Sequence, residues 1–90
     1  MPQKTASKPW CVYLLECQDG SFYTGITNRL AQRFVAHKLG KGARYTRSHP
    51  PKQLIGSLPY ANRSQASIAE HQIKQLKRDQ KLTLFKPTKV

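Results

Sequence analysis

The chain has 90 residues, with 16 Lys and Arg against four Asp and Glu, and its formal net charge at pH 7 is +12. A chain of this length builds one domain with a core of modest size, and it has no apolar run near the ~20 residues of a membrane span. The first nine residues lack the apolar region of a secretory signal, so we expect a cytoplasmic protein whose positive charge binds a polyanion such as nucleic acid. No long helical pattern sets Trp, Phe or Leu opposite its lysines, which argues against a membrane surface as the partner.

The N-terminal part of the chain predicts a β-hairpin. Residues 1–9 are polar, and we expect them to form a flexible arm. Residues 10–17 and 22–27 are apolar and aromatic, as is typical of strands. The Asp-Gly pair between them, at Asp19, is a strong signal for a hairpin turn.

A helix and a basic segment follow the hairpin. Thr27 or Asn28 can cap the helix, and Gly40 ends it. Its apolar side is formed by residues that recur at helical spacing: Leu30, Ala31, Phe34, Val35 and Leu39. Residues 41–52 contain several cations, glycines and a Pro-Pro pair, and we expect them to form a basic loop.

The C-terminal part predicts one more strand and further helices. Residues 53–60 form the third strand, and Asn62 or Ser64 caps the next helix. The buried side of that helix comprises Ala66, Ala69, Ile73 and Leu76. A short turn or helix around residues 82–85 packs back, and residues 86–90 form a frayed tail.

The order of these elements predicts the fold class. The order β-β-α-β-α, with an optional last helix, indicates an α/β (α+β) domain over residues 10–85. We expect a small three-stranded antiparallel sheet flanked by helices.

The cysteines and histidines predict neither a disulfide nor a zinc site. Cys11 and Cys17 lie six residues apart on one predicted strand, so they cannot easily reach each other, and we expect two reduced, buried thiols. A zinc site with His37, His49 and His71 is excluded because the usual ligand spacings are missing.

Two tripeptides and three single residues carry the strongest functional signal. They are Cys11-Val12-Tyr13, Tyr23-Thr24-Gly25, Arg33, His37 and Glu70. This ordered set resembles the GIY-YIG nuclease superfamily, over nearly the whole chain from Trp10 to Arg78, and most closely its small stand-alone bacterial branch. The resemblance implies a metal-dependent DNA endonuclease that hydrolyses phosphodiester bonds.

The resemblance implies that Tyr13 and Tyr23 flank the scissile phosphate and help to activate the attacking water. An unperturbed phenol is only about 0.1% ionised at pH 7. Nearby positive charge must therefore lower the pKa, or a metal-bound water must take part. The structural alternative is that both tyrosines simply pack on a half-buried sheet.

The register of the hairpin decides whether the two tyrosines share a face. A two-residue loop would place Tyr13 and Tyr23 on opposite faces, whereas an odd loop that pairs Tyr13 with Thr27 places them on one face with Gly25. Because the resemblance implies one site, we expect the odd loop.

The first helix carries the next two residues of the set. In the resembled family, the arginine that matches Arg33 stabilises charge on the phosphoryl oxygens, for which its planar fork is well suited. His37 matches a position that orients the site or contacts the phosphate. Both residues lie on the flank of the predicted apolar side, with Arg29. We expect Arg29 to be exposed, and for His37 an exposed side chain without a role in the site is an equal alternative.

Glu70 matches the family's metal ligand and is expected to bind one Mg2+ or Mn2+ ion. One carboxylate is enough for Mg2+, which keeps several waters and binds phosphate oxygens as well. The alternative is an exposed glutamate that pairs with Lys74 at i+4.

The substrate-binding residues are expected in and beside the basic segment: Gly25, Lys41, Arg44, Tyr45 and Arg47. Tyr45 could stack on an unpaired base. A second basic side, along one long last helix, would comprise Lys74, Lys77, Arg78 and Lys81.

We therefore expect an endonuclease that prefers single-stranded or branched DNA, because so small a domain has little surface for reading a long sequence. A protein partner could direct it to its target. The alternatives are a DNA- or RNA-binding module that keeps the fold without catalysis, and an interaction protein that uses only its basic surface.

Overall fold

The computed structural model describes residues 9–86. Its elements are β1 (Trp10–Cys17), β2 (Phe22–Thr27), α1 (Leu30–Lys38), α2 (Arg44–Ser48), β3 (Pro51–Tyr60), α3 (Arg63–Lys74) and α4 (Arg78–Phe85). The predicted fold class is confirmed. The arm predicted for residues 1–9 and the tail predicted for residues 86–90 lie outside the described residues, apart from Pro9 and Lys86. Within residues 9–86, none of the helices is long and apolar enough to cross a membrane.

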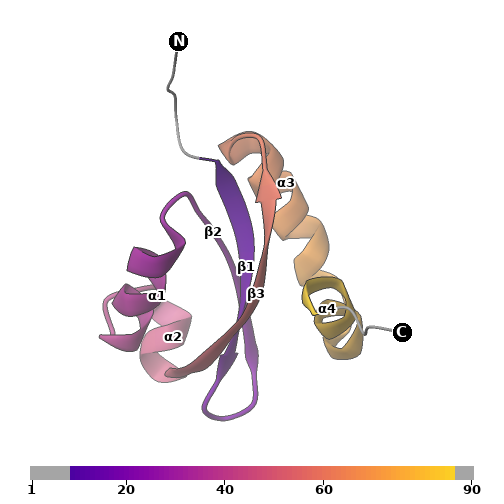
Figure 1. The fold of residues 1–90 in the computed structure, drawn as a ribbon. Helices are drawn as coiled ribbons and strands as arrows, with labels where there is room; N and C mark the ends of the chain where they lie inside the picture. Colours follow the sequence, from indigo (N-terminus) through magenta and orange to yellow (C-terminus); the bar gives the residue numbers. More distant parts are fainter. Residues whose placement is uncertain (1–8, 87–90) are drawn as a thin grey trace.

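The three strands form one sheet in the order β2-β1-β3, and both strand pairs are antiparallel. Helices α1 and α2 lie on one side of the sheet, and α3 and α4 lie on the other (Figure 1). The central strand β1 is therefore covered on both faces, and its residues from Val12 to Leu15 are at most 1% exposed.

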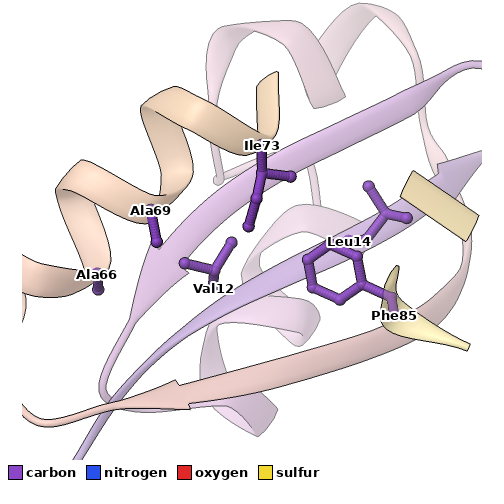
Figure 2. Packing of buried hydrophobic residues seen from close by; sticks show 6 residues of the cluster. All are labelled: Val12, Leu14, Ala66, Ala69, Ile73 and Phe85. Carbon is purple, nitrogen blue, oxygen red and sulfur yellow. The ribbon is translucent and has the colours of Figure 1, made fainter. Parts of the chain in front are cut away.

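The hydrophobic core lies between the sheet and the two C-terminal helices. Val12 and Leu14 point to this side and pack against Ala66, Ala69, Ile73 and Phe85 (Figure 2). The predicted buried side of α3 is thus confirmed, with Leu76 packed against the same cluster just beyond the end of the helix. Because successive side chains of a strand point to opposite faces, the alternate residues of β1 are left for the other side.

A three-residue loop connects β1 and β2. The amide of Cys17 donates to the carbonyl of Ser21 (2.8 Å), and the amide of Gly20 donates to the carbonyl of Cys17 (2.9 Å). Gly20 has a φ of +86°, the left-handed conformation that a three-residue hairpin loop requires at its last position. The prediction of an odd loop is confirmed.

The register of the hairpin brings the motif residues together. Tyr13 pairs with Gly25, and Tyr23 pairs with Leu15, so the two tyrosines share one face of the sheet. The predicted pairing of Tyr13 with Thr27 is wrong by two residues, because the loop begins one residue earlier than expected. A shift of two residues keeps every side chain on its face, so the shared face is unaffected.

Two predicted segments differ from the structure. Residues 41–52 are not all loop: they contain α2, and β3 begins at Pro51. The single long last helix is also wrong, because α3 ends at Lys74 and α4 begins at Arg78. Between them Lys77 is extended, and its amide donates to the side-chain oxygen of Gln80 (2.8 Å), which starts a new helix.

Candidate active site

A hydrogen bond between two buried side chains lies at the centre of the site. Tyr13 is in the middle of β1 and is 1% exposed, and His37 is on α1 and is also 1% exposed. The Tyr13 hydroxyl lies 2.7 Å from Nε2 of His37. The face of β1 opposite the hydrophobic core is thus occupied by a polar pair.

The side of α1 that faces the sheet differs from the prediction. His37 is the buried residue of this helix, whereas Val35 and Leu39 are 53% and 66% exposed. The side chains of Thr27 and Asn28 do not cap the helix either: Arg29 is the N-cap, and the Thr27 hydroxyl accepts from its amide (3.0 Å). The hydrogen bond of His37 to Tyr13 turns this side of α1 toward the sheet. The prediction used only the spacing of apolar residues, which gives no sign of such a bond.

The pKa values of the central pair show that both groups are neutral at pH 7. Burial raises the pKa of Tyr13 to about 12, although a side-chain interaction with Arg33 opposes the shift. Burial, and secondly the positive charge of Arg33, lower the pKa of His37 to about 4. Of the two possibilities considered for an active tyrosine, a pKa lowered by nearby positive charge does not hold for Tyr13, because the loss of solvation outweighs the effect of the guanidinium.

A third residue completes the chain of hydrogen bonds. Nδ1 of His37 lies 2.6 Å from Oγ1 of Thr46, and Thr46 donates to the carbonyl of Ala43 (3.0 Å). Thr46 is 1% exposed and belongs to the short helix α2. Its role could not be recognised from the sequence, because its partner is nine residues away.

Two glycines let the backbone press against the central pair. A Cβ atom on Gly25 would overlap the Tyr13 hydroxyl, and one on Gly42 would overlap Nδ1 of His37. Gly25 is thus close to the centre of the site, as expected, and its close neighbour in the structure is a tyrosine. At Gly42 the backbone lies close to the imidazole of His37.

An aromatic cluster extends from the central pair along α2. The ring centroid of Tyr23 lies 6.3 Å from that of Tyr13 and 5.2 Å from that of His37. Tyr45 stacks on Tyr23 at 6.0 Å, and His49 stacks on Tyr45 at 4.0 Å with an interplanar angle of 4°. His49 was not expected in the site, although its spacing of four residues from Tyr45 was an available signal.

The outer end of the cluster is tied to the hairpin turn. Oδ2 of Asp19 lies 3.7 Å from Nε2 of His49, and Nδ1 of His49 lies 3.0 Å from the carbonyl of Tyr45. The amide and hydroxyl of Ser21 donate to Asp19 and hold the pKa of its carboxyl below the usual value. The Asp-Gly turn therefore helps to place His49 as well as joining two strands.

Three cations lie around α2. Lys41, Arg44 and Arg47 are all exposed, and Tyr45 between them is half-buried. The short helix thus presents two of these cations next to the stacked rings, a combination of charge and aromatic surface that suits nucleic acid.

Glu70 forms an ion pair with a lysine of its own helix. It belongs to α3, which covers the opposite side of the sheet (Figure 1), and its carboxylate lies 3.2 Å from Nζ of Lys74. The pairing at i+4 considered as an alternative is therefore present. Residues 9–86 contain no cluster of three or more His, Cys, Asp and Glu side chains that could enclose a metal ion. One half-buried carboxylate fits only an ion that keeps most of its water ligands, such as Mg2+.

Cys11 and Cys17 are free, and burial raises the pKa of both thiols. The expectation that they form no disulfide is confirmed. Cys17 is buried and Cys11 is half-buried.

Comparison with known proteins supports the resemblance stated from the motifs. A family model described as the GIY-YIG catalytic domain matches residues 9–83. A UPF0213 protein of Xanthomonas axonopodis pv. citri is 56% identical over 77 residues, which are 86% of this chain and 76% of that protein. A UPF0213 protein of Nitratidesulfovibrio vulgaris is 45% identical over 82 residues, 91% of this chain and 74% of the relative.

Two solved structures are similar as well. The solution NMR structure of the protein EF2693 from E. faecalis has a TM-score of 0.59 and 40% identity, and the match covers 87% of this chain and 83% of that one. The solution NMR structure of the UPF0213 protein BH0048 from Bacillus halodurans has a TM-score of 0.51 and 39% identity, with coverage of 84% and 81%.

Proposed function

Because this chain belongs to the GIY-YIG catalytic-domain family and is a relative of the small bacterial UPF0213 proteins, we propose that it is a metal-dependent DNA endonuclease. One observation carries the proposal. The buried hydroxyl of Tyr13 is hydrogen-bonded to His37, and the Arg33 guanidinium interacts with both groups. A purely structural tyrosine needs neither a buried imidazole nor a cation beside it.

In the proposed reaction Arg33 and Tyr23 meet the phosphate first, because both are more exposed than Tyr13. The guanidinium binds the phosphoryl oxygens and stabilises the charge that develops on them. The Tyr13 hydroxyl is buried in the free protein, so the proposal requires that it become accessible to the attacking water when substrate binds.

Tyr13 acts as a proton relay in this proposal. With a pKa of about 12, only roughly 0.001% of this phenol is ionised at pH 7, so it is a poor base by itself. As the attacking water loses a proton to the Tyr13 oxygen, the phenol gives its own proton to Nε2 of His37. His37 ends as an imidazolium, and the water oxygen forms the new bond to phosphorus while the leaving oxygen departs.

Glu70 is the residue that would hold the divalent ion, Mg2+ or Mn2+. When bound, such an ion polarises the phosphate and the leaving oxygen. Lys74, which now pairs with Glu70, would have to release the carboxylate. Variants of Glu70 therefore test directly whether this carboxylate binds the ion.

The cations and rings around α2 support a nucleic-acid substrate with unpaired bases. Base stacking on an aromatic side chain contributes ~1–3 kcal/mol per base and tolerates any sequence. We propose Gly25, Lys41, Arg44, Tyr45 and Arg47 as the substrate-binding set, and single-stranded or branched DNA as the preferred substrate. A protein partner would supply any further targeting.

The proposal is tested with end-labelled single-stranded, duplex, flap and branched DNA, and with matching RNA, in Mg2+, Mn2+ or EDTA. Y13F, R33K and E70Q should each lower the cleavage rate about 100-fold or more, as expected when a proton-transfer or charge-stabilising group is removed. The matched variants Y60F, R29K and E16Q change the same residue types outside the site and should cleave normally. Binding without cleavage on every substrate would contradict the proposal.

A second function is favoured by the pairing of Glu70 with Lys74. In a binding module without catalysis, this glutamate would only stabilise α3. E70Q should then bind DNA or RNA slightly more tightly, because a negative charge is lost near a polyanion. Metal-dependent cleavage that E70Q abolishes would exclude this alternative.

A further inference from the structure

The hydroxyl of Thr46 contacts the buried imidazole on the side opposite Tyr13. Its oxygen lies 2.6 Å from Nδ1 of His37 and 3.0 Å from the carbonyl oxygen of Ala43, and the side chain is 1% exposed.

The number of protons available determines the direction of these bonds. A carbonyl oxygen only accepts, so the proton between Thr46 and Ala43 belongs to the hydroxyl. A hydroxyl has one proton, so the proton between Thr46 and His37 must come from Nδ1. A neutral imidazole has one N–H, which leaves Nε2 as an acceptor for the Tyr13 hydroxyl.

The opposite direction of these hydrogen bonds leaves fewer polar groups with a partner. If Thr46 donated to Nδ1, the carbonyl of Ala43 would keep only its bond from the amide of Arg47 (3.2 Å). Nε2 of His37 would then donate to the oxygen of Tyr13, and the phenol's own proton would have no acceptor in the chain of bonds. A buried phenol proton without an acceptor is energetically unfavourable, so the first direction is favoured.

The backbone keeps the imidazole in this position. At Gly42 it lies so close to Nδ1 that a Cβ atom would overlap the ring. The low pKa of His37, about 4, agrees with a ring that carries a single proton at pH 7. The ring is therefore held between Thr46 and Tyr13 and cannot easily turn over.

From this geometry we infer that Thr46 is a positioning residue that keeps the proton of His37 on Nδ1, so that Nε2 faces Tyr13 as a proton acceptor. The catalytic consequence rests on the proposed function: the phenol can give its proton to His37 only if Nε2 is free. The step moves one proton from the Tyr13 oxygen to Nε2, while the proton on Nδ1 stays on its bond to Thr46.

The test compares T46V, which removes the hydroxyl and nearly keeps the shape, with T46S, which keeps the hydroxyl. Thr24 supplies a matched control, because it is also a buried threonine, and its hydroxyl has no hydrogen-bond partner in the described part of the chain. T24V therefore removes a buried hydroxyl without breaking a hydrogen bond.

The first measurement is the protonation of the His37 ring nitrogens by ¹H–¹⁵N NMR of the full chain. In the wild type, T46S and T24V, Nδ1 should carry the proton and Nε2 should not. In T46V the proton should move wholly or partly to Nε2, because Nδ1 has lost its acceptor. A proton on Nε2 in the wild type would overturn the inference, and this outcome needs no variant to fold.

The second measurement is cleavage of the best DNA substrate. T46V should lower kcat about 10–100-fold with little change in KM, the range seen when a group that orients a reacting residue is removed, and T46S should restore it. An active wild type with an equally active T46V would overturn the inference and leave the proposed function standing. An inactive wild type whose Nδ1 carries the proton would contradict the proposed function and would leave the placement of the His37 proton by Thr46 standing.

Discussion

Tyr13 and His37 show how burial sets the chemistry of single residues. Burial disfavours the charged form of both groups, so the pKa of the phenol rises and that of the imidazole falls. The positive charge of Arg33 lowers both pKa values, so it adds to the effect of burial on His37 and opposes the effect of burial on Tyr13. The pair is consequently a neutral hydrogen bond at rest, and it becomes charged only when a proton moves.

The buried imidazole should make stability depend on pH. Its pKa is about 4 in the folded chain and about 6.5 when unfolded, so the unfolded state binds the extra proton first. The stability present above pH 6.5 should therefore fall as the pH is lowered to 4, by roughly 3 kcal/mol at about 1.4 kcal/mol per pKa unit. Urea unfolding at several pH values measures this loss.

H37Q provides the comparison, because glutamine does not titrate. The stability difference between the wild type and H37Q should shrink as the pH falls from 6.5 to 4. Tyr13, which is hydrogen-bonded to the ring, stays neutral over this range because its pKa is about 12. Parallel curves for the two proteins would contradict the prediction.

At the scale of elements, the strand β1 separates two environments. Its residues Val12 and Leu14 face α3 and α4, whereas Tyr13 faces α1 and α2. The first side resembles an ordinary core and the second holds polar, hydrogen-bonded groups. The helices of the core side therefore pack on the sheet through apolar residues, whereas α1 and α2 supply His37 and Thr46, the buried polar partners on the other side.

The N-cap of α3 allows a direct test of how that helix is held. The side-chain oxygen of Asn62 accepts from the amide of Gln65 (2.9 Å). N62A should lower the free energy of unfolding by about 1 kcal/mol, as is usual for a lost N-cap, without moving the hydrogen bonds of His37. Ser64, the other cap candidate, does not serve as the cap, so S64A should change the stability much less; an equal loss would contradict the assignment.

At the scale of the whole molecule, the charge of +12 governs how the protein meets a polyanion. The cations around α2 lie on the same side of the sheet as Tyr13 and His37. Other cations lie elsewhere, among them Arg63 at the start of α3, whose guanidinium lies over the ring of Trp10 at 5.6 Å. Salt dependence can tell cations that contact phosphate from those that do not.

If Arg47 contacts a phosphate, R47A should weaken binding of single-stranded DNA and reduce the slope of log K against log salt by about 0.7. R63A removes the same charge from α3, on the other side of the sheet, and should leave the slope unchanged. Fluorescence anisotropy at several salt concentrations gives both slopes. Equal changes for the two variants would show that the positive charge acts only as a general field.

The sequence alone was sufficient for the order of the three strands, for the presence of α1 and α3, and for the buried side of α3. These features depend on local rules, namely the alternation of side chains along a strand and helical periodicity. The shared face of Tyr13 and Tyr23 was expected from the resemblance instead, because a two-residue Asp-Gly loop would place them on opposite faces. The family also followed from the motifs, because their residue types occur in one characteristic order along the chain.

Only the tertiary structure decided which side of α1 faces the sheet, that residues 44–48 form a helix, and that Thr46 and His49 belong to the site. Each depends on contacts between residues far apart in the chain, such as the hydrogen bond from Tyr13 to His37. The pKa of Tyr13 belongs here too, because positive charge can be counted in a sequence whereas the loss of solvation depends on packing. Local pattern determined the elements of this protein, and burial determined the chemical state of the residues between them.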